Sequence, residues 1–166
     1  AQLTRRRDEV ESDQRIEAPV VTMIAAPAYQ DWIDGTGKLS QNVTSAAWWH
    51  PAVRYKGKDV FGSTEAYVAA FQAKYGALPD YAEGSASAAG AILQLAIEKA
   101  GSIERTKVRD ALSAMNEMTF WGPVKFGPNG QITSLEPPVF QIQKGKPIVI
   151  HPKSIRQGEL QLGVSN

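Results

Sequence analysis

The sequence predicts an α/β fold built on a parallel sheet. Two short apolar runs, residues 18–26 and 42–49, contain the β-branched residues typical of strands. A short helical segment separates them, and strand–helix–strand alternation indicates that the two strands run parallel. After residue 119 the hydrophobic period changes to two, which predicts β-hairpins towards the end of the chain.

Composition excludes several classes of function. The 166 residues suit one domain rather than two, and a net charge of +1 gives no electrostatic case for binding nucleic acid. The chain has no cysteine, and its two histidines, His50 and His151, have no partners at metal-ligand spacing. We therefore expect no metal and no other cofactor. No run is long enough to span a bilayer, and no signal peptide is visible in this chain.

The first third of the chain holds the predicted strand–helix–strand unit. Residues 3–14 are highly charged and fit either an exposed helix or a frayed tail. Residues 18–26 fit a strand that is buried on both faces. Residues 28–39 then fit a short helix that stops near Gly35 and Gly37.

Three helices are predicted in the middle of the chain. Ser63 is a good N-cap for the first helix, and Gly76 ends it. The longest helix covers residues 81–100, and Ser102 is expected to start the third. The apolar stripe of the longest helix follows helical spacing; its members are Ala89, Ile92, Leu93, Ala96, Ile97 and Ala100.

Two hairpins are predicted after these helices. Residues 120–126 and the segment from 131 onward form a loose hairpin around a turn at 127–130. Residues 139–143 and 147–151 form a clearer one.

Aromatic residues mark the most informative candidate site. Trp48 and Trp49 lie at the carboxyl end of the second predicted strand, and Tyr29 follows the end of the first. In open parallel sheets, ligands bind outside the carboxyl ends of the strands, where aromatic rings can stack on them. Adjacent residues of an extended chain point to opposite faces, so at most one tryptophan lines a given cleft. The alternative for this pair is a core or interface role. No nucleophile–base pair or carboxylate pair indicates an enzyme.

The order of several short motifs resembles a known family. They are Ala25-Ala-Pro-Ala-Tyr29, Trp48-Trp-His-Pro51, Phe61-Gly-Ser-Thr-Glu-Ala-Tyr67, Pro79-Asp-Tyr81, Ala96-Ile-Glu-Lys-Ala-Gly-Ser102, Phe120-Trp-Gly-Pro-Val-Lys-Phe126 and Phe140-Gln-Ile-Gln-Lys-Gly145. Over residues 20–152 the chain resembles the C-terminal half of type I periplasmic substrate-binding proteins, the branched-chain amino acid or Leu/Ile/Val-binding family.

This resemblance implies a Rossmann-like, two-lobed protein in the periplasm that delivers a small ligand to an ABC permease. Residues 1–50 would belong to the second lobe and residues 51–138 to the first. Residues 139–166 would form a closing hairpin, returning to the second lobe, and a tail. The chain would be a truncated form whose exposed surfaces favour self-association. A sensor or regulatory ligand-binding module of the same fold is the alternative function.

The resemblance also implies site residues. The loop with Ala28 and Tyr29 matches the loop that offers a carboxylate to the ligand ammonium in amino-acid-binding members. The alanine and tyrosine here favour an apolar or aromatic carboxylate over a branched-chain amino acid. Tyr81 matches an aromatic position that packs on the ligand, and Trp48 or Trp49 lies near the hinge. Glu83 and Ser85 either line the mouth of the long helix or cap it.

Overall fold

The computed structural model describes residues 18–163, so the charged segment predicted at residues 3–14 lies outside the described residues. The described chain forms two compact units. Unit 1 comprises the described residues up to Ala52 together with those from Pro137 onward, and unit 2 is Val53–Glu136. The single domain suggested by chain length is therefore wrong, because the middle of the chain folds as a unit of its own.

Unit 1 is built on a four-stranded mixed sheet in the order β1-β2-β5-β6. Strands β1 (Val21–Ile24) and β2 (Val43–Ala46) are parallel, as the strand–helix–strand pattern predicts. Strands β5 (Val139–Gln143) and β6 (Lys146–His151) form the predicted hairpin, and β5 pairs antiparallel with β2.

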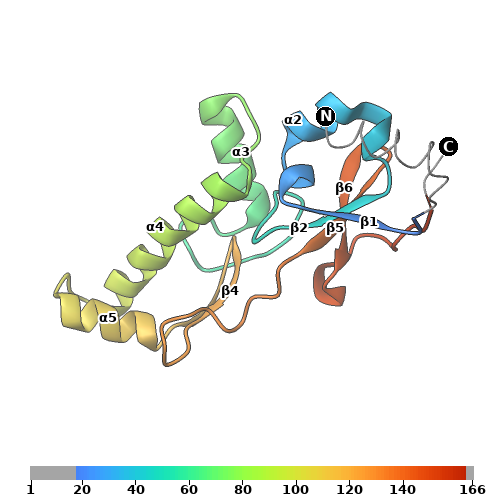
Figure 1. Ribbon diagram of the computed structural model, residues 1–166. Coiled ribbons are helices and arrows are strands. Elements are labelled where there is room, and N and C mark those ends of the chain that lie inside the picture. The colour runs from blue at the N-terminus through green and yellow to red at the C-terminus, as the bar shows by residue number, and fades with distance from the viewer. Residues whose placement is uncertain (1–17, 164–166) are drawn as a thin grey trace. The chain divides into compact units, whose positions relative to one another are not determined.

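Helical segments join and follow these strands. Between β1 and β2 the chain forms η1 (Ala26–Ala28), α2 (Gln30–Thr36) and η2 (Gly37–Ser40), and η3 (Lys153–Ile155) follows β6. Figure 1 shows α2 over the sheet. The core at this contact joins Ala28 and Ile33 to Phe140 and Ile142 of β5.

Strand β1 departs from its prediction. It lies at the edge of the sheet rather than between two strands, and its residues alternate between half-buried and exposed. Ile24, at its end, is 91% exposed. The apolar run looks like a doubly buried strand in sequence, but among the described residues only β2 pairs with it.

The opposite face of β5 carries a buried amide. Gln141 alternates with Phe140 and Ile142, so its side chain points away from α2. Its Nε2 donates to the carbonyls of Asn42 (3.0 Å) and Gln161 (2.8 Å). Its Oε1 accepts from Gln143 Nε2 and from the Gln161 backbone N–H, both at 2.9 Å. These bonds hold the segment around Gln161 against the sheet.

Unit 2 contains α3 (Thr64–Tyr75), α4 (Tyr81–Ala100) and α5 (Arg105–Ser113). The predicted cap at Ser63 is present, since its side chain accepts from the Ala66 N–H at 3.1 Å. Gly76 and Gly101 end α3 and α4 in the left-handed conformation, as their positions predict. Ser102 does not start α5; Glu104 is its N-cap.

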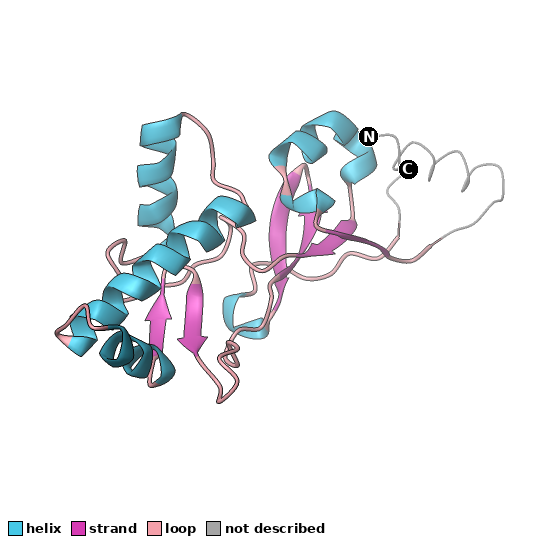
Figure 2. Cartoon of the chain, turned by 60° about the vertical axis from the view of Figure 1, so that its left-hand side comes forward, coloured by secondary structure: helices cyan, strands magenta, loops and turns pink. Residues whose placement is uncertain are grey.

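The hairpin of unit 2 starts earlier than predicted. Strand β3 (Asn116–Thr119) pairs antiparallel with β4 (Gly122–Lys125), and the turn between them contains Phe120. The predicted turn at 127–130 also exists, and a single bridge between Phe126 and Ile132 closes it. Figure 2 shows α4 running beside this two-stranded sheet.

The core of unit 2 is aromatic. Tyr67 of α3 stacks on Phe120 with ring centroids 4.3 Å apart, and Phe61 meets both rings edge-on at 5.0 Å. Thr64 supports this cluster, because its buried hydroxyl donates to the Phe120 carbonyl at 2.6 Å. The buried face of α4 is rotated slightly from the predicted one. Its buried residues include Ala88, Ala91, Ile92 and Ala96.

Candidate functional site

The carboxyl ends of β1 and β2 lie side by side in unit 1. Their parallel register pairs Ile24 with Ala46, and the chain leaves the sheet immediately after each residue. Ala25, which follows β1, has φ 64° and ψ −48°, a strained conformation for a residue with a side chain. This bend starts the loop that the sequence assigns to the ligand.

Within that loop, the two predicted site residues have different surroundings. Ala28 is buried in the core beneath α2, and its N–H donates to the Ala25 carbonyl at 2.8 Å. Tyr29 is half-buried at the N-terminus of α2, where its carbonyl accepts from the Trp32 N–H at 3.1 Å. Of the two side chains, the tyrosine is the one with an accessible surface.

The two tryptophans after β2 also differ in their exposure to solvent. Trp49 is 0% exposed, whereas Trp48 is 61% exposed. The neighbouring His50 is buried, with its ring 4.9 Å from that of Phe140 and its Nδ1 accepting from the Ala52 N–H at 3.0 Å. Of the four predicted site residues in unit 1, Tyr29 and Trp48 are therefore the two whose aromatic surfaces a ligand could reach.

The other three predicted site residues lie on α4 in unit 2. Tyr81 is the first residue of the helix and is half-buried. Glu83 belongs to a capping box: it accepts from the Asp80 N–H at 3.1 Å, while Asp80 accepts from the Ala82 N–H at 2.7 Å. The capping role of Glu83, one of the two alternatives from the sequence, is thus present. Ser85 accepts from Trp121 Nε1 at 3.2 Å.

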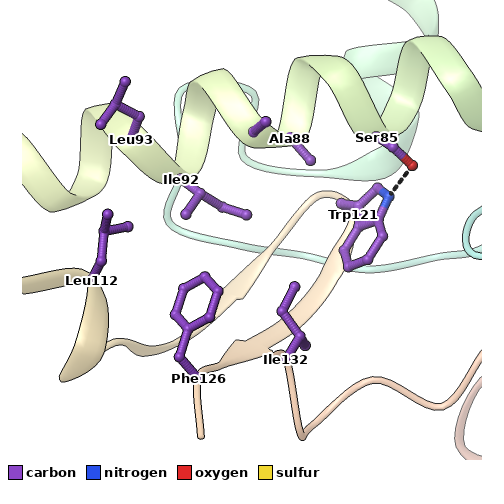
Figure 3. Close-up of a pocket in the computed structure, with 9 residues that line it drawn as sticks. Ser85, Ala88, Ile92, Leu93, Leu112, Trp121, Phe126 and Ile132 are labelled. Atoms are coloured by element: carbon purple, nitrogen blue, oxygen red, sulfur yellow. Dashed lines mark hydrogen bonds between the residues drawn. The ribbon is translucent and has the colours of Figure 1, made fainter. Parts of the chain in front are cut away.

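Ser85 and Trp121 also line an apolar pocket of about 320 Å³ in unit 2, which is open to solvent (Figure 3). Helix α4 supplies much of one wall, with Ile92 among its residues, and Phe126 and Ile132 lie on the side of the hairpin. Sequence reasoning did not assign Trp121 to a site. The available signal was a tryptophan beside the tight turn into β4, three residues before the buried Val124.

One phenol in the aromatic core of unit 2 has a shifted pKa. Burial raises the pKa of Tyr67, and a hydrogen bond to Ser87 at 3.0 Å partly opposes the rise. The phenol is therefore neutral at physiological pH.

Among residues 18–163, no three His, Asp or Glu side chains gather closely enough to hold a metal ion. No helix in the same range is long and apolar enough to cross a membrane.

Solved structures of ABC-transporter binding proteins share this fold. A candidate branched-chain amino acid ABC transporter from Silicibacter pomeroyi matches 97% of the chain with a TM-score of 0.73 and 16% identity, over 44% of its own length. A second from Rhodospirillum rubrum matches 83% with a TM-score of 0.62 and 24% identity, over 39% of its length.

A third structure is an ABC-transporter solute-binding protein from R. palustris in complex with benzoate. It matches 81% of the chain with a TM-score of 0.54 and 17% identity, over 34% of its length. The chain thus spans less than half of each of these proteins, and their common α/β fold confirms the predicted fold class.

The sequence itself identifies the family. The family model for periplasmic binding proteins matches residues 13–147, which is most of the chain. This match confirms the resemblance found in the motifs, and it points to binding of a ligand rather than to catalysis. The chain belongs to the periplasmic binding protein family.

Proposed function

We propose that this chain is part of the solute-binding component of an ABC importer and that its ligand is a small carboxylate with an apolar or aromatic body. The observation that carries the ligand class is the accessible aromatic surface of Tyr29 and Trp48 at the strand ends of unit 1. Ligands of open α/β sheets bind at such ends, and flat ligands stack on aromatic rings.

The positions of the acidic side chains favour a carboxylate ligand over an amino acid ligand. A buried ammonium needs an acceptor, ideally a carboxylate, or its transfer from water costs several kcal/mol. The loop beside Tyr29 has alanines instead, and Glu83 is engaged in the capping box of α4. Asp31 is the nearest acidic residue in the sequence, and it is exposed in the first turn of α2. The benzoate complex of the R. palustris protein provides a precedent for an aromatic acid in this fold.

In this proposal, residues 1–50 and 139–166 belong to the second lobe of a periplasmic binding protein, and residues 51–138 belong to the first. Tyr81 and Ser85 then contribute from the first lobe. Capture requires that the ligand contact a closed form better than an open one, because only differential affinity shifts the equilibrium. The closed form would dock on an ABC permease in the periplasm, and no chemical step is involved.

Calorimetric titration tests the ligand class. The chain is titrated with benzoate, 4-hydroxycinnamate, leucine and phenylalanine, and the aromatic acids are expected to bind more tightly than either amino acid. Glu83→Gln is the matched variant, and it is expected to leave the affinity for benzoate unchanged. Tight leucine binding that Glu83→Gln abolishes, without a response to the aromatic acids, contradicts the proposal. Permease and ATPase genes adjacent to the gene for this chain would support the transport role.

A further inference from the structure

Unit 1 and unit 2 are joined by two crossings of the chain. The chain leaves unit 1 after Ala52 and returns to it at Pro137. Motion between two units is absorbed by a few backbone torsions at such crossings, so bonds to the crossing residues limit that motion. At the return crossing, proline rings fix φ at positions 137 and 138, and the Pro138 carbonyl accepts from the Ala47 N–H at 3.3 Å. The return crossing is therefore restrained from the side of unit 1.

The first crossing is restrained by side chains. The N–H of Ala52 donates to Nδ1 of the buried His50 at 3.0 Å, and the Ala52 carbonyl accepts from Nε2 of Gln157. That carbonyl belongs to the peptide bond between Ala52 and Val53, which is the bond that joins the two units. Because rotation about ψ of Ala52 would carry the oxygen away from Gln157, this hydrogen bond restrains the crossing itself.

Gln157 is held in turn by β6. Its backbone N–H donates to the Val149 carbonyl at 2.8 Å, and its Oε1 accepts from the Val149 N–H at 3.3 Å. Val149 is fully buried in the strand. One side-chain amide thus accepts from the sheet with its oxygen and donates to the crossing with its nitrogen. A carboxylate at position 157 could replace the acceptor but not the donor.

Beyond the crossing, unit 2 holds the next carbonyl. Arg54 Nη1 donates to the Val53 carbonyl at 3.0 Å, and Arg54 Nε pairs with Glu65, in the first turn of α3, at 3.3 Å. Successive carbonyls are therefore held from different units, that of Ala52 by Gln157 and that of Val53 by Arg54. Between the two anchored carbonyls the backbone has two soft torsions, φ and ψ of Val53.

We propose that Gln157 is a positioning residue for the first crossing, whose amide narrows the range of arrangements that the two units sample. The consequence for ligand binding rests on the proposed function. If capture closes the units on benzoate, a crossing released from Gln157 has more freedom to lose on closure, and the affinity falls. The narrowing itself needs no ligand, so it can be measured in the free chain.

Pulsed EPR measures this narrowing. The chain has no cysteine, so spin labels can be attached selectively to Lys38→Cys in unit 1 and Ile103→Cys in unit 2, both at exposed positions. In the free chain, Gln157→Ala and Gln157→Glu are both expected to broaden the distribution of label-to-label distances. The reason is that neither new side chain can donate to the Ala52 carbonyl.

Gln161→Ala is the matched control. Gln161 lies in the same C-terminal segment, and its side chain bonds Gln143 at 3.4 Å rather than the crossing. This variant should keep the width of the wild-type distribution. The proposal is overturned if either Gln157 variant keeps the wild-type width, or if Gln161→Ala broadens the distribution as much as they do.

Titration with benzoate separates this proposal from the proposed function. Gln157→Ala is expected to weaken benzoate binding about three-fold, within the range for loss of one hydrogen bond. Broadening in the Gln157 variants of a chain that does not bind benzoate would refute the proposed ligand and support the role of Gln157. Unchanged width together with unchanged benzoate affinity would refute the role of Gln157 and leave the proposed function standing.

Discussion

Tyr81 allows the proposed function to be tested at a single side chain. Its ring lies at the first turn of α4, half-buried. Tyr81→Ala is expected to weaken benzoate binding by about 1–3 kcal/mol, the range for loss of an aromatic anchor. The midpoint of thermal unfolding without ligand should barely change. A large loss of stability with unchanged affinity would show that Tyr81 is a packing residue.

Ala25 is the residue at which backbone strain can be measured. With φ 64°, its Cβ crowds the backbone, and glycine would relieve the crowding but increase the entropy of the unfolded chain. We expect Ala25→Gly to raise the free energy of unfolding by up to about 1 kcal/mol. Ala25→Val is expected to lower it by more than about 1 kcal/mol, because a β-branched residue tolerates this conformation least. Denaturant unfolding measures both, and equal stability of the two variants would contradict the strain.

At this scale, sequence reasoning located the aromatic candidates but not their surroundings. The alternation of an extended chain predicts that Trp48 and Trp49 separate, and their exposures of 61% and 0% show this separation. Which of the two is buried depends on packing after β2, which periodicity does not encode. The Ser85–Trp121 hydrogen bond joins residues 36 positions apart, so no local pattern reveals it.

Among the elements, α5 depends on a charged cap. The backbone N–H groups of Thr106 and Lys107 donate to Glu104 at 2.9 and 3.1 Å, and these bonds hold the pKa of Glu104 below its ordinary value of 4.5. A carboxyl group with a lowered folded-state pKa stabilises the fold above its unfolded-state pKa, and this stabilisation is lost as pH falls through the folded-state value.

Thermal unfolding from about pH 7 to pH 3 measures this contribution. Glu104→Gln is expected to melt below the wild type at neutral pH, and the difference should shrink as the pH falls below 4.5. Glu98→Gln, an exposed change on α4, controls for general charge effects. A difference that stays constant across the whole range would exclude the charged cap.

Thr64 connects α3 to the turn of the hairpin. Its buried hydroxyl donates to the Phe120 carbonyl at 2.6 Å and accepts from the Tyr55 N–H at 3.1 Å. Thr64→Val is expected to lower the free energy of unfolding by about 1–3 kcal/mol, because two backbone groups lose this partner. Thr133→Val is the control: its hydroxyl bonds the exposed Lys125 carbonyl, where water can substitute, so a loss of less than about 0.5 kcal/mol is expected. Similar losses for both variants in urea unfolding would refute this assignment.

Helix boundaries were predictable where a side chain or a glycine acts locally. Ser63, Gly76 and Gly101 act within one turn of the chain, and each lies where the sequence places it. Strand β3 was not predicted, because its four residues, Asn-Glu-Met-Thr, have no strand pattern. Long-range bonds support it instead: the Lys58 N–H donates to the Met118 carbonyl at 3.1 Å, and the buried Asp59 accepts from the neighbouring Phe120 N–H at 2.7 Å.

For the whole molecule, the sheet edge of unit 1 predicts self-association. Strand β1 ends the described sheet, and Ile24 on it is 91% exposed. An unprotected edge strand is a template for another strand, and a stable contact buries more than about 1,000 Å². Sedimentation at high micromolar concentration is expected to show reversible association that Ile24→Lys weakens. Ile103→Lys, at an exposed isoleucine of unit 2, should have no effect, and a monomeric wild type would disprove the prediction.

The buried amide of Gln141 has a consequence for how the C-terminal segment can vary between related proteins. An amide group has two hydrogens and one oxygen with two lone pairs, and all four positions are used here. Both bonds to position 161 reach main-chain atoms, so they do not depend on which side chain stands there. Substitutions at this position should be tolerated, whereas a one-residue deletion between η3 and Gln161 would shift the register and leave the amide without those partners. In this segment, selection should therefore preserve spacing more strictly than residue identity.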